Sequence, residues 1–145
     1  MRQFAYKKKH PVSGKEMPDI GIVYISDDSM MDRVPEGAME VGENPVDEDK
    51  EGAYFSAWRL QDDGTVTLDL AEAKNVRLAW LRERRDAFLE HLDKVQFRYY
   101  CSGNEDGVAQ VEKEKQELRD FPANIDWNAI VTLHDIKHIL PPILI

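Results

Sequence analysis

The chain has 145 residues with 42% hydrophobic content, which is enough to bury a core in one domain or in a small head joined to a helical arm. Its formal net charge of −9 argues against nucleic-acid binding through phosphate contacts and against docking on anionic membranes. The single cysteine, Cys101, excludes an internal disulfide. Because the N-terminus lacks the apolar run of a signal peptide and no apolar stretch reaches membrane-spanning length, we expect a cytoplasmic protein.

Residues 1–69 are predicted to form a small head with antiparallel strands. Residues 1–19 mix basic residues with Pro and Gly, and we expect an irregular or weakly paired segment there. Residues 20–25 are β-branched and aromatic, which predicts a strand, and residues 38–41 predict a second short one. Between them, residues 27–33 are expected to form a short helix with Ser26 as its cap.

Residues 42–52 are acidic and rich in turn formers, which predicts a solvated loop. The loop begins at Asp47 like a calcium site, but Trp58 stands at the twelfth position, where calcium loops need a bidentate Glu. We therefore expect no calcium there. Residues 54–60 and 65–68 flank Asp62-Asp63-Gly64, which predicts a β-hairpin.

Residues 70–101 contain neither Gly nor Pro, and their apolar side chains recur at helical spacing, which predicts one long helix. Asp69 suits its N-cap, with Glu72 at capping-box spacing. Gly103 suits the left-handed position after the helix, and residues 105–120 predict a second helix with a narrow apolar seam of coiled-coil type. The short connection implies an antiparallel hairpin over residues 70–121.

Residues 122–145 are expected to form a C-terminal extension. Thr132 predicts the cap of a short helix over residues 133–140, with Asp135 at capping-box spacing. The apolar tail at 139–145 is expected to dock on the head or on a partner. The predicted fold class is therefore α+β: a small antiparallel β head, a long antiparallel helical hairpin and a short C-terminal helix.

His134 and His138 stand at the i, i+4 spacing of a metalloprotease zinc site. Asp135 replaces the general-base Glu of that motif, and the sequence offers no evident third ligand. A metal-dependent hydrolase is thus kept only as an alternative, and we expect a protein without enzymatic activity, metal or cofactor. Cys101 has no base within reach, because His91 lies almost three helical turns away.

We expect the helical hairpin to carry the protein contacts, because the apolar stripe of its first helix is longer than a small head can cover. Phe97, Tyr99 and Tyr100 cannot all face Val108, and exposure there would mark a contact surface. The partner is another protein or a second copy of the chain, which would give a homodimer. The residues predicted to provide packing and contact are Trp80, Phe88, Leu92, Val95, Tyr99, Val111 and Leu118.

Four features occur in order along the chain: Ala57-Trp58, the Arg-rich helix at residues 76–93, the aromatic segment at residues 97–100, and Lys-Gln-Glu-Leu-Arg-Asp at residues 115–120 followed by Pro122. Together they resemble a loosely defined set of small proteins encoded in the tail modules of tailed bacteriophages and prophages. The resemblance covers residues 33–140, is best in 57–126, and weakens at residues 101–104.

The resemblance implies a non-enzymatic accessory protein of the bacterial host's cytoplasm that assists tail or tail-fibre assembly. The partner implied by the resemblance is a phage tail or tail-fibre protein. The resemblance carries no active-site residues over to this chain. A structural component of the virion, in the baseplate or fibre, is the first alternative. An acidic nucleic-acid mimic that inhibits a host DNA-binding protein is a further one.

Overall fold

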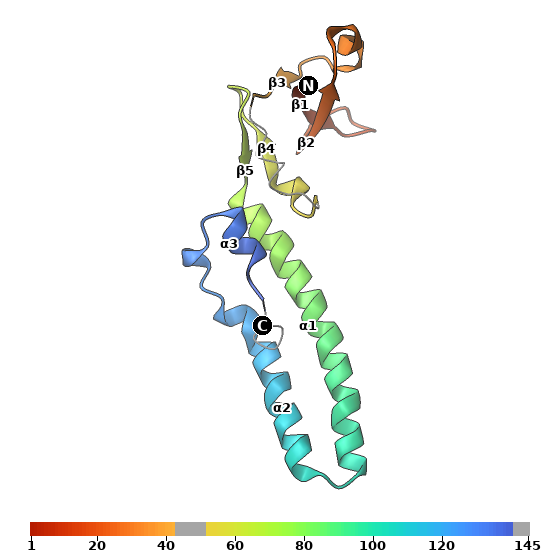
Figure 1. Ribbon diagram of the computed structural model, residues 1–145, viewed down its shortest axis with the longest axis vertical. Coiled ribbons are helices and arrows are strands. Elements are labelled where there is room, and N and C mark those ends of the chain that lie inside the picture. Colours follow the sequence, from red (N-terminus) through yellow and green to blue (C-terminus); the bar gives the residue numbers. More distant parts are fainter. Residues whose placement is uncertain (43–51, 141–145) are drawn as a thin grey trace. The chain divides into compact units, whose positions relative to one another are not determined.

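The computed structural model describes residues 1–42 and 52–140 (Figure 1). Most of the predicted acidic loop and the end of the apolar tail lie outside these residues. The fold class is α+β, as predicted, with antiparallel strands first and helices after them. By compactness the chain divides into two units, Met1–Ala73 and Lys74–Ile145, with the boundary inside the long helix.

The first unit contains a three-stranded antiparallel sheet of order β2-β1-β3. Its strands are β1 (Arg2–Lys9), β2 (Glu16–Ile25) and β3 (Met39–Glu40). The strand expected at residues 20–25 is confirmed. The expectation of an irregular or weakly paired segment at residues 1–19 is wrong for residues 2–9 and 16–19, which form a ladder of paired strands, and holds for the connection at residues 10–15. Pairing with β2 makes β1 a strand and buries Phe4 and Ala5, whereas its lysines give no strand signal of their own.

Gly21 lies directly opposite Tyr6 in the β1–β2 ladder. The Tyr6 ring covers the glycine so closely that a Cβ atom at position 21 would overlap its outer carbons. An aromatic ring laid over a cross-strand glycine protects a strand position that has no side chain of its own.

Residues Asp28–Arg33 form the 3-10 helix η1. Its cap is Asp27, whose Oδ1 accepts a hydrogen bond from the Ser29 amide at 2.8 Å, so the predicted cap at Ser26 is wrong by one position. Aspartate and serine are about equally good caps, and the negative charge of a carboxylate also suits the positive end of the helix.

The predicted β-hairpin is confirmed, with β4 (Trp58–Leu60) and β5 (Val66–Leu68) paired in antiparallel fashion. Its first strand is shorter than expected, because the 3-10 helix η3 (Phe55–Ala57) precedes it. In this first unit, η3 and β4 lie against β2. The fully or nearly fully buried side chains of the unit include Phe4, Ala5, Ile20, Ile25, Val41, Tyr54, Ala57, Trp58, Leu60 and Val66.

The long helix α1 has the predicted bounds, Leu70–Cys101. Asp69 caps it, because its Oδ1 accepts a hydrogen bond from the Glu72 amide at 3.2 Å. The amide of Asp69 donates instead to the Ala57 carbonyl at 2.7 Å. In a capping box, the Glu72 side chain would accept a hydrogen bond from the Asp69 amide. That amide is already bonded to Ala57, the residue just before β4.

Helix α2 (Glu105–Asp120) also has the predicted bounds and runs antiparallel to α1 (Figure 1). The Asn104 amide donates to the Tyr99 carbonyl at 2.9 Å and the Gly103 amide donates to the Tyr100 carbonyl at 3.2 Å. With Gly103 at φ 73°, these bonds form a Schellman motif. Asn104 then caps α2, because its Oδ1 accepts from the Gly107 amide at 2.9 Å.

After α2 come the 3-10 helices η4 (Phe121–Asn124) and η5 (Trp127–Ala129) and the short helix α3 (Leu133–Lys137). The capping box of Thr132 and Asp135 is confirmed, although α3 ends before residue 140. Arg77 of α1 holds the end of α3, because it donates hydrogen bonds to the carbonyls of Lys137 and Ile139 at 3.0 and 3.1 Å.

Candidate contact surface of the helical hairpin

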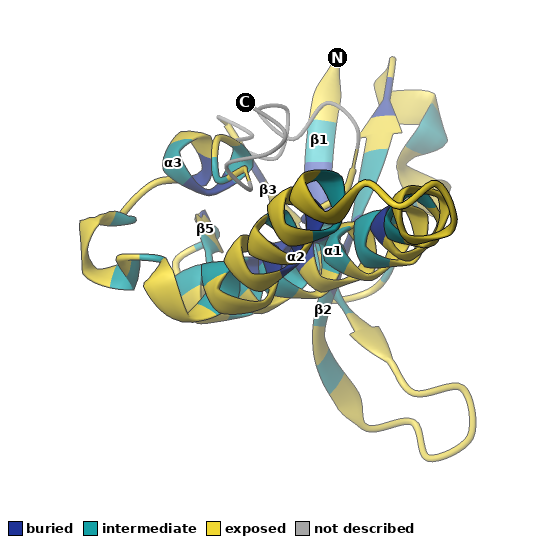
Figure 2. Cartoon of the chain, turned by 90° about the horizontal axis from the view of Figure 1, so that it is seen from below, coloured by how far each residue is buried: buried dark blue, intermediate teal, exposed yellow. Residues whose placement is uncertain are grey.

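The apolar seam predicted for the hairpin lies between α1 and α2. Leu92, Val111 and Leu118 form a buried cluster, with relative exposures of 7%, 4% and 1%. Phe88, Leu89 and Val95 pack against this cluster, while much of the outward surface of both helices is exposed (Figure 2). Five of the seven predicted packing and contact residues are thus brought together inside the hairpin.

The other two predicted contact residues lie elsewhere. Trp80 is half-buried, with the Arg77 and Arg84 guanidinium carbons 4.0 and 4.9 Å from its ring centroid. These cation–π contacts cover part of the indole with side chains of the same helix. Tyr99 packs on Gly107, where a Cβ atom would lie 2.7 Å from its Cγ, and it keeps 37% of its surface exposed.

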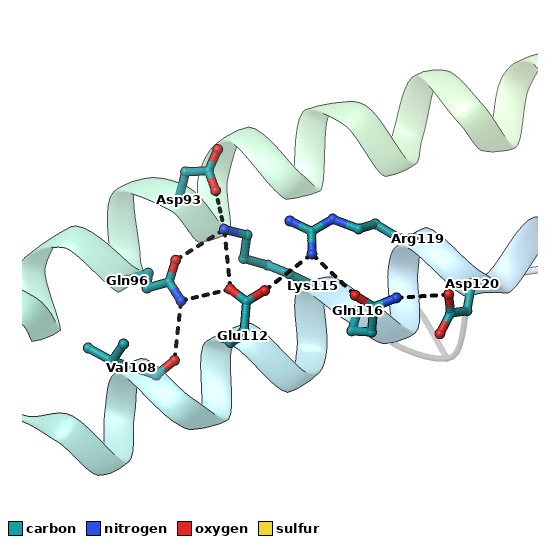
Figure 3. A network of polar contacts seen from close by, with 8 residues as sticks. All are labelled: Asp93, Gln96, Val108, Glu112, Lys115, Gln116, Arg119 and Asp120. Atoms are coloured by element: carbon teal, nitrogen blue, oxygen red, sulfur yellow. Dashed lines mark hydrogen bonds and ion pairs between the residues drawn. The ribbon is translucent and has the colours of Figure 1, made fainter.

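A polar network lies beside the apolar seam (Figure 3). Lys115 of α2 is only 8% exposed, and its Nζ reaches Asp93 Oδ1 of α1 at 2.6 Å. The same nitrogen donates to Gln96 Oε1 at 3.0 Å and lies 3.7 Å from Glu112 Oε2. The lysine stem is thus covered, and its charge is paired across the two helices, as is usual for a buried charge.

Glu112 is the second centre of this network. It accepts a hydrogen bond from the Gln96 side-chain amide at 3.0 Å and one from Arg119 at 3.2 Å. These two bonds, together with the charges of Lys115 and Arg119, lower the pKa of Glu112 below its ordinary value. Because the polar partners must face one another, the network favours a single axial register of α1 against α2.

The hairpin ends in exposed aromatic side chains. Phe97 and Tyr100 keep 66% and 74% of their surfaces exposed and lie on one face of α1 at i, i+3 spacing. Two adjoining hollows, of about 560 and 430 Å³, share Gln96, Tyr100 and Val108 in their linings. Large exposed aromatic rings beside a concave surface are typical of protein contact sites.

The charged side chains that line these two hollows, Asp93, Glu105 and Glu112, are all carboxylates. The predicted contact set includes Tyr99 but omits Phe97, Tyr100, Val108 and Glu105, which the structure places around the hollows. The signal for them in the sequence is the run of three aromatic residues within residues 97–100, because one neighbouring helix cannot cover three such side chains.

His134 and His138 contact each other, with ring centroids 4.1 Å apart and planes tilted by 40°. The Nδ1 atom of His138 lies 2.7 Å from the His134 carbonyl oxygen, within hydrogen-bond distance of the helix backbone. Within residues 1–42 and 52–140, no group of three or more His, Cys, Asp and Glu side chains is arranged to hold a metal ion. Cys101 is exposed.

The first unit has a hollow of its own, of about 740 Å³, whose lining includes Lys7, Lys9, Glu16, Glu36 and Asp62. Its charges are mixed, so it shows no preference for a cation or an anion. In the same unit, the Trp58 indole nitrogen is buried without a hydrogen-bond partner among the described residues.

None of the helices in the part of the chain that the structure describes is long and apolar enough to cross a membrane. Comparisons of the chain with protein-family models, with curated proteins and with solved structures found no match. The resemblance to phage tail-module proteins therefore stays a prediction from the sequence.

Proposed function

We propose that this protein is a phage-type accessory protein that assists tail or tail-fibre assembly by binding a tail or tail-fibre protein. It acts by protein contact and not by catalysis. The observation that carries this proposal is the hairpin of α1 and α2, which exposes Phe97 and Tyr100 at its end. The resemblance over residues 57–126 supports the choice of partner, because it includes both helices of this hairpin.

Two features of the hairpin favour a role as a rigid contact element. Its seam is filled by its own side chains, with Leu118 only 1% exposed. Beside the seam, Lys115 of α2 binds Asp93 and Gln96 of α1. A partner therefore meets a surface that is already ordered, and little conformational entropy is lost on binding.

The test is co-expression of the tail-fibre protein of the same phage or prophage with and without this chain. We expect assembled fibre to increase several-fold when the chain is present, and the two proteins to be isolated together by pull-down. Equal fibre assembly in its absence would contradict the proposal.

Purified virions separate this role from that of a structural component. An assembly factor leaves before the particle is complete, so it should be missing from virions that contain the fibre. Stoichiometric amounts of the chain in virions, measured by quantitative mass spectrometry, would instead assign it to the baseplate or fibre.

A further inference from the structure

The end of the hairpin is an ordered structure, although its aromatic residues are exposed. The Schellman motif at Gly103 and the cap at Asn104 fix the connection between α1 and α2. Tyr99 packs on Gly107, and the Ser102 hydroxyl donates to the Tyr99 carbonyl at 3.0 Å. Phe97 and Tyr100 are therefore held on a rigid support, which is the condition under which exposed aromatic residues make strong contacts.

We propose that the two hollows beside Tyr100 bind a short segment of a partner protein that combines aliphatic side chains with Lys or Arg. This inference rests on the proposed function, since it names the chemistry by which the partner is bound. Tyr100, Val108 and Ala109 provide the apolar part of the site, and burying an aliphatic side chain against them is favourable. An amphipathic helix that lays its apolar side into such a groove is a common mode of peptide recognition.

Charge selects the occupant. Glu105 lines the larger hollow from the first turn of α2, with no basic side chain among the described residues that line either hollow. Asp93 and Glu112 line the same surface, and their charges are partly balanced by Lys115 and Arg119. A basic segment therefore gains attraction where an acidic one meets repulsion. A second copy of this chain that docked by the same surface would place its own Glu105, Asp93 and Glu112 against these carboxylates. Nucleic-acid phosphates would meet the same repulsion.

The test uses three synthetic peptides of 14 residues, which is about four helical turns. The first is an amphipathic peptide of Leu and Lys, the second carries Glu at each Lys position, and the third carries Ser at each Leu position. Binding to the full chain is measured by two-dimensional NMR titration. We expect the Leu–Lys peptide to bind at least tenfold more tightly than either control and to shift the amide signals of residues 96–109.

Two pairs of variants locate the site. Tyr100→Ala should weaken binding of the Leu–Lys peptide at least fivefold, whereas Tyr24→Ala, at a tyrosine of β2 that is 49% exposed, should leave it unchanged. Glu105→Lys should weaken binding several-fold, whereas Glu117→Lys makes the same charge change on α2 away from the hollows and should have little effect. All four side chains are exposed, so each substitution should leave the fold intact, and circular dichroism verifies this for each variant.

Equal weakening by Tyr24→Ala or Glu117→Lys would show that the peptide binds non-specifically and not in the hollows, and it would overturn the proposal. Sedimentation of the free chain tests the other occupant: a dimer that Tyr100→Ala dissociates would assign the hollows to a second copy. Fibre assembly that needs the chain but tolerates Tyr100→Ala would refute this site and keep the proposed function. Peptide binding that needs Tyr100, with fibre assembly independent of the chain, would refute the proposed function alone.

Discussion

Gly107 and Glu112 show how single residues of α2 determine its packing against α1. Gly107 is useful because it has no side chain, which lets the Tyr99 ring lie against the α2 backbone. Glu112 is useful because its two oxygens connect Gln96 of α1 with Arg119 of α2. Both effects are local and can be tested by one substitution and its matched control.

Gly107→Ala would usually stabilise a helix by up to about 1 kcal/mol, because alanine has the higher helix propensity. Here we expect the opposite, a loss of about 1–3 kcal/mol in the free energy of unfolding, because the new Cβ would lie 2.7 Å from Tyr99 Cγ and 2.9 Å from Asn104 Nδ2. Urea denaturation measures this loss. In a Tyr99→Ala background the same substitution should cost less, because only the contact with Asn104 remains, and a loss of equal size there would contradict the role of Tyr99.

The lowered pKa of Glu112 predicts an acid dependence of stability. Because the folded-state pKa lies below the ordinary value of 4.5, the stabilisation is fully present above about pH 4.5 and is lost as the pH falls through the folded-state value. Wild-type protein should therefore lose more thermal stability between pH 6 and pH 3 than Glu112→Gln. Glu117→Gln, which removes a carboxyl outside the network of Figure 3, is the control and should behave as the wild type.

The elements of the hairpin are defined by their ends as much as by their apolar stripes. Residues 70–101 and 105–120 form helices with the predicted bounds, because Asp69 and Asn104 cap them and Gly103 ends the first. The signals at Asp69 and Gly103 are local and are predicted from the sequence, whereas the cap at Asn104 comes from the structure. The 3-10 helix η3 had no comparable signal, and the strand predicted there was too long.

Gly103→Ala tests the end of α1. A left-handed φ of 73° costs an L-residue about 1–2 kcal/mol, so we expect a loss of that size in the free energy of unfolding. Gly103→Asn should lose less, because asparagine tolerates this conformation better. Thermal unfolding followed by circular dichroism gives both values, and an alanine variant as stable as the wild type would contradict the role of the Schellman motif.

At the scale of the whole molecule, each of the two compact units has its own buried side chains. Ile20 is fully buried in the first unit and Leu118 is 1% exposed in the second. We therefore expect the buried residues of each unit to protect mainly the backbone amides of that unit from hydrogen exchange, as in cooperative folding units.

Leu118→Ala should remove about 2–5 kcal/mol of stability by leaving a cavity in the hairpin seam. Hydrogen exchange followed by mass spectrometry should then show faster exchange in α2 and in residues 88–101, with little change in β1 and β2. Ile20→Ala should give the reverse pattern. Uniform acceleration along the chain after either substitution would show that the two units unfold as one.

The sequence alone determined the α+β class, the bounds of both long helices, the caps at Asp69 and Thr132 and the antiparallel connection, because these depend on residues close together in the chain. Only the tertiary structure decided how the predicted packing and contact residues divide between burial and exposure. It made β1 a strand through pairing with β2, and it buried Leu92, Val111 and Leu118 in the hairpin seam. The aromatic surface at Phe97 and Tyr100 is what remained exposed, since side-chain burial depends on neighbours that are distant in sequence.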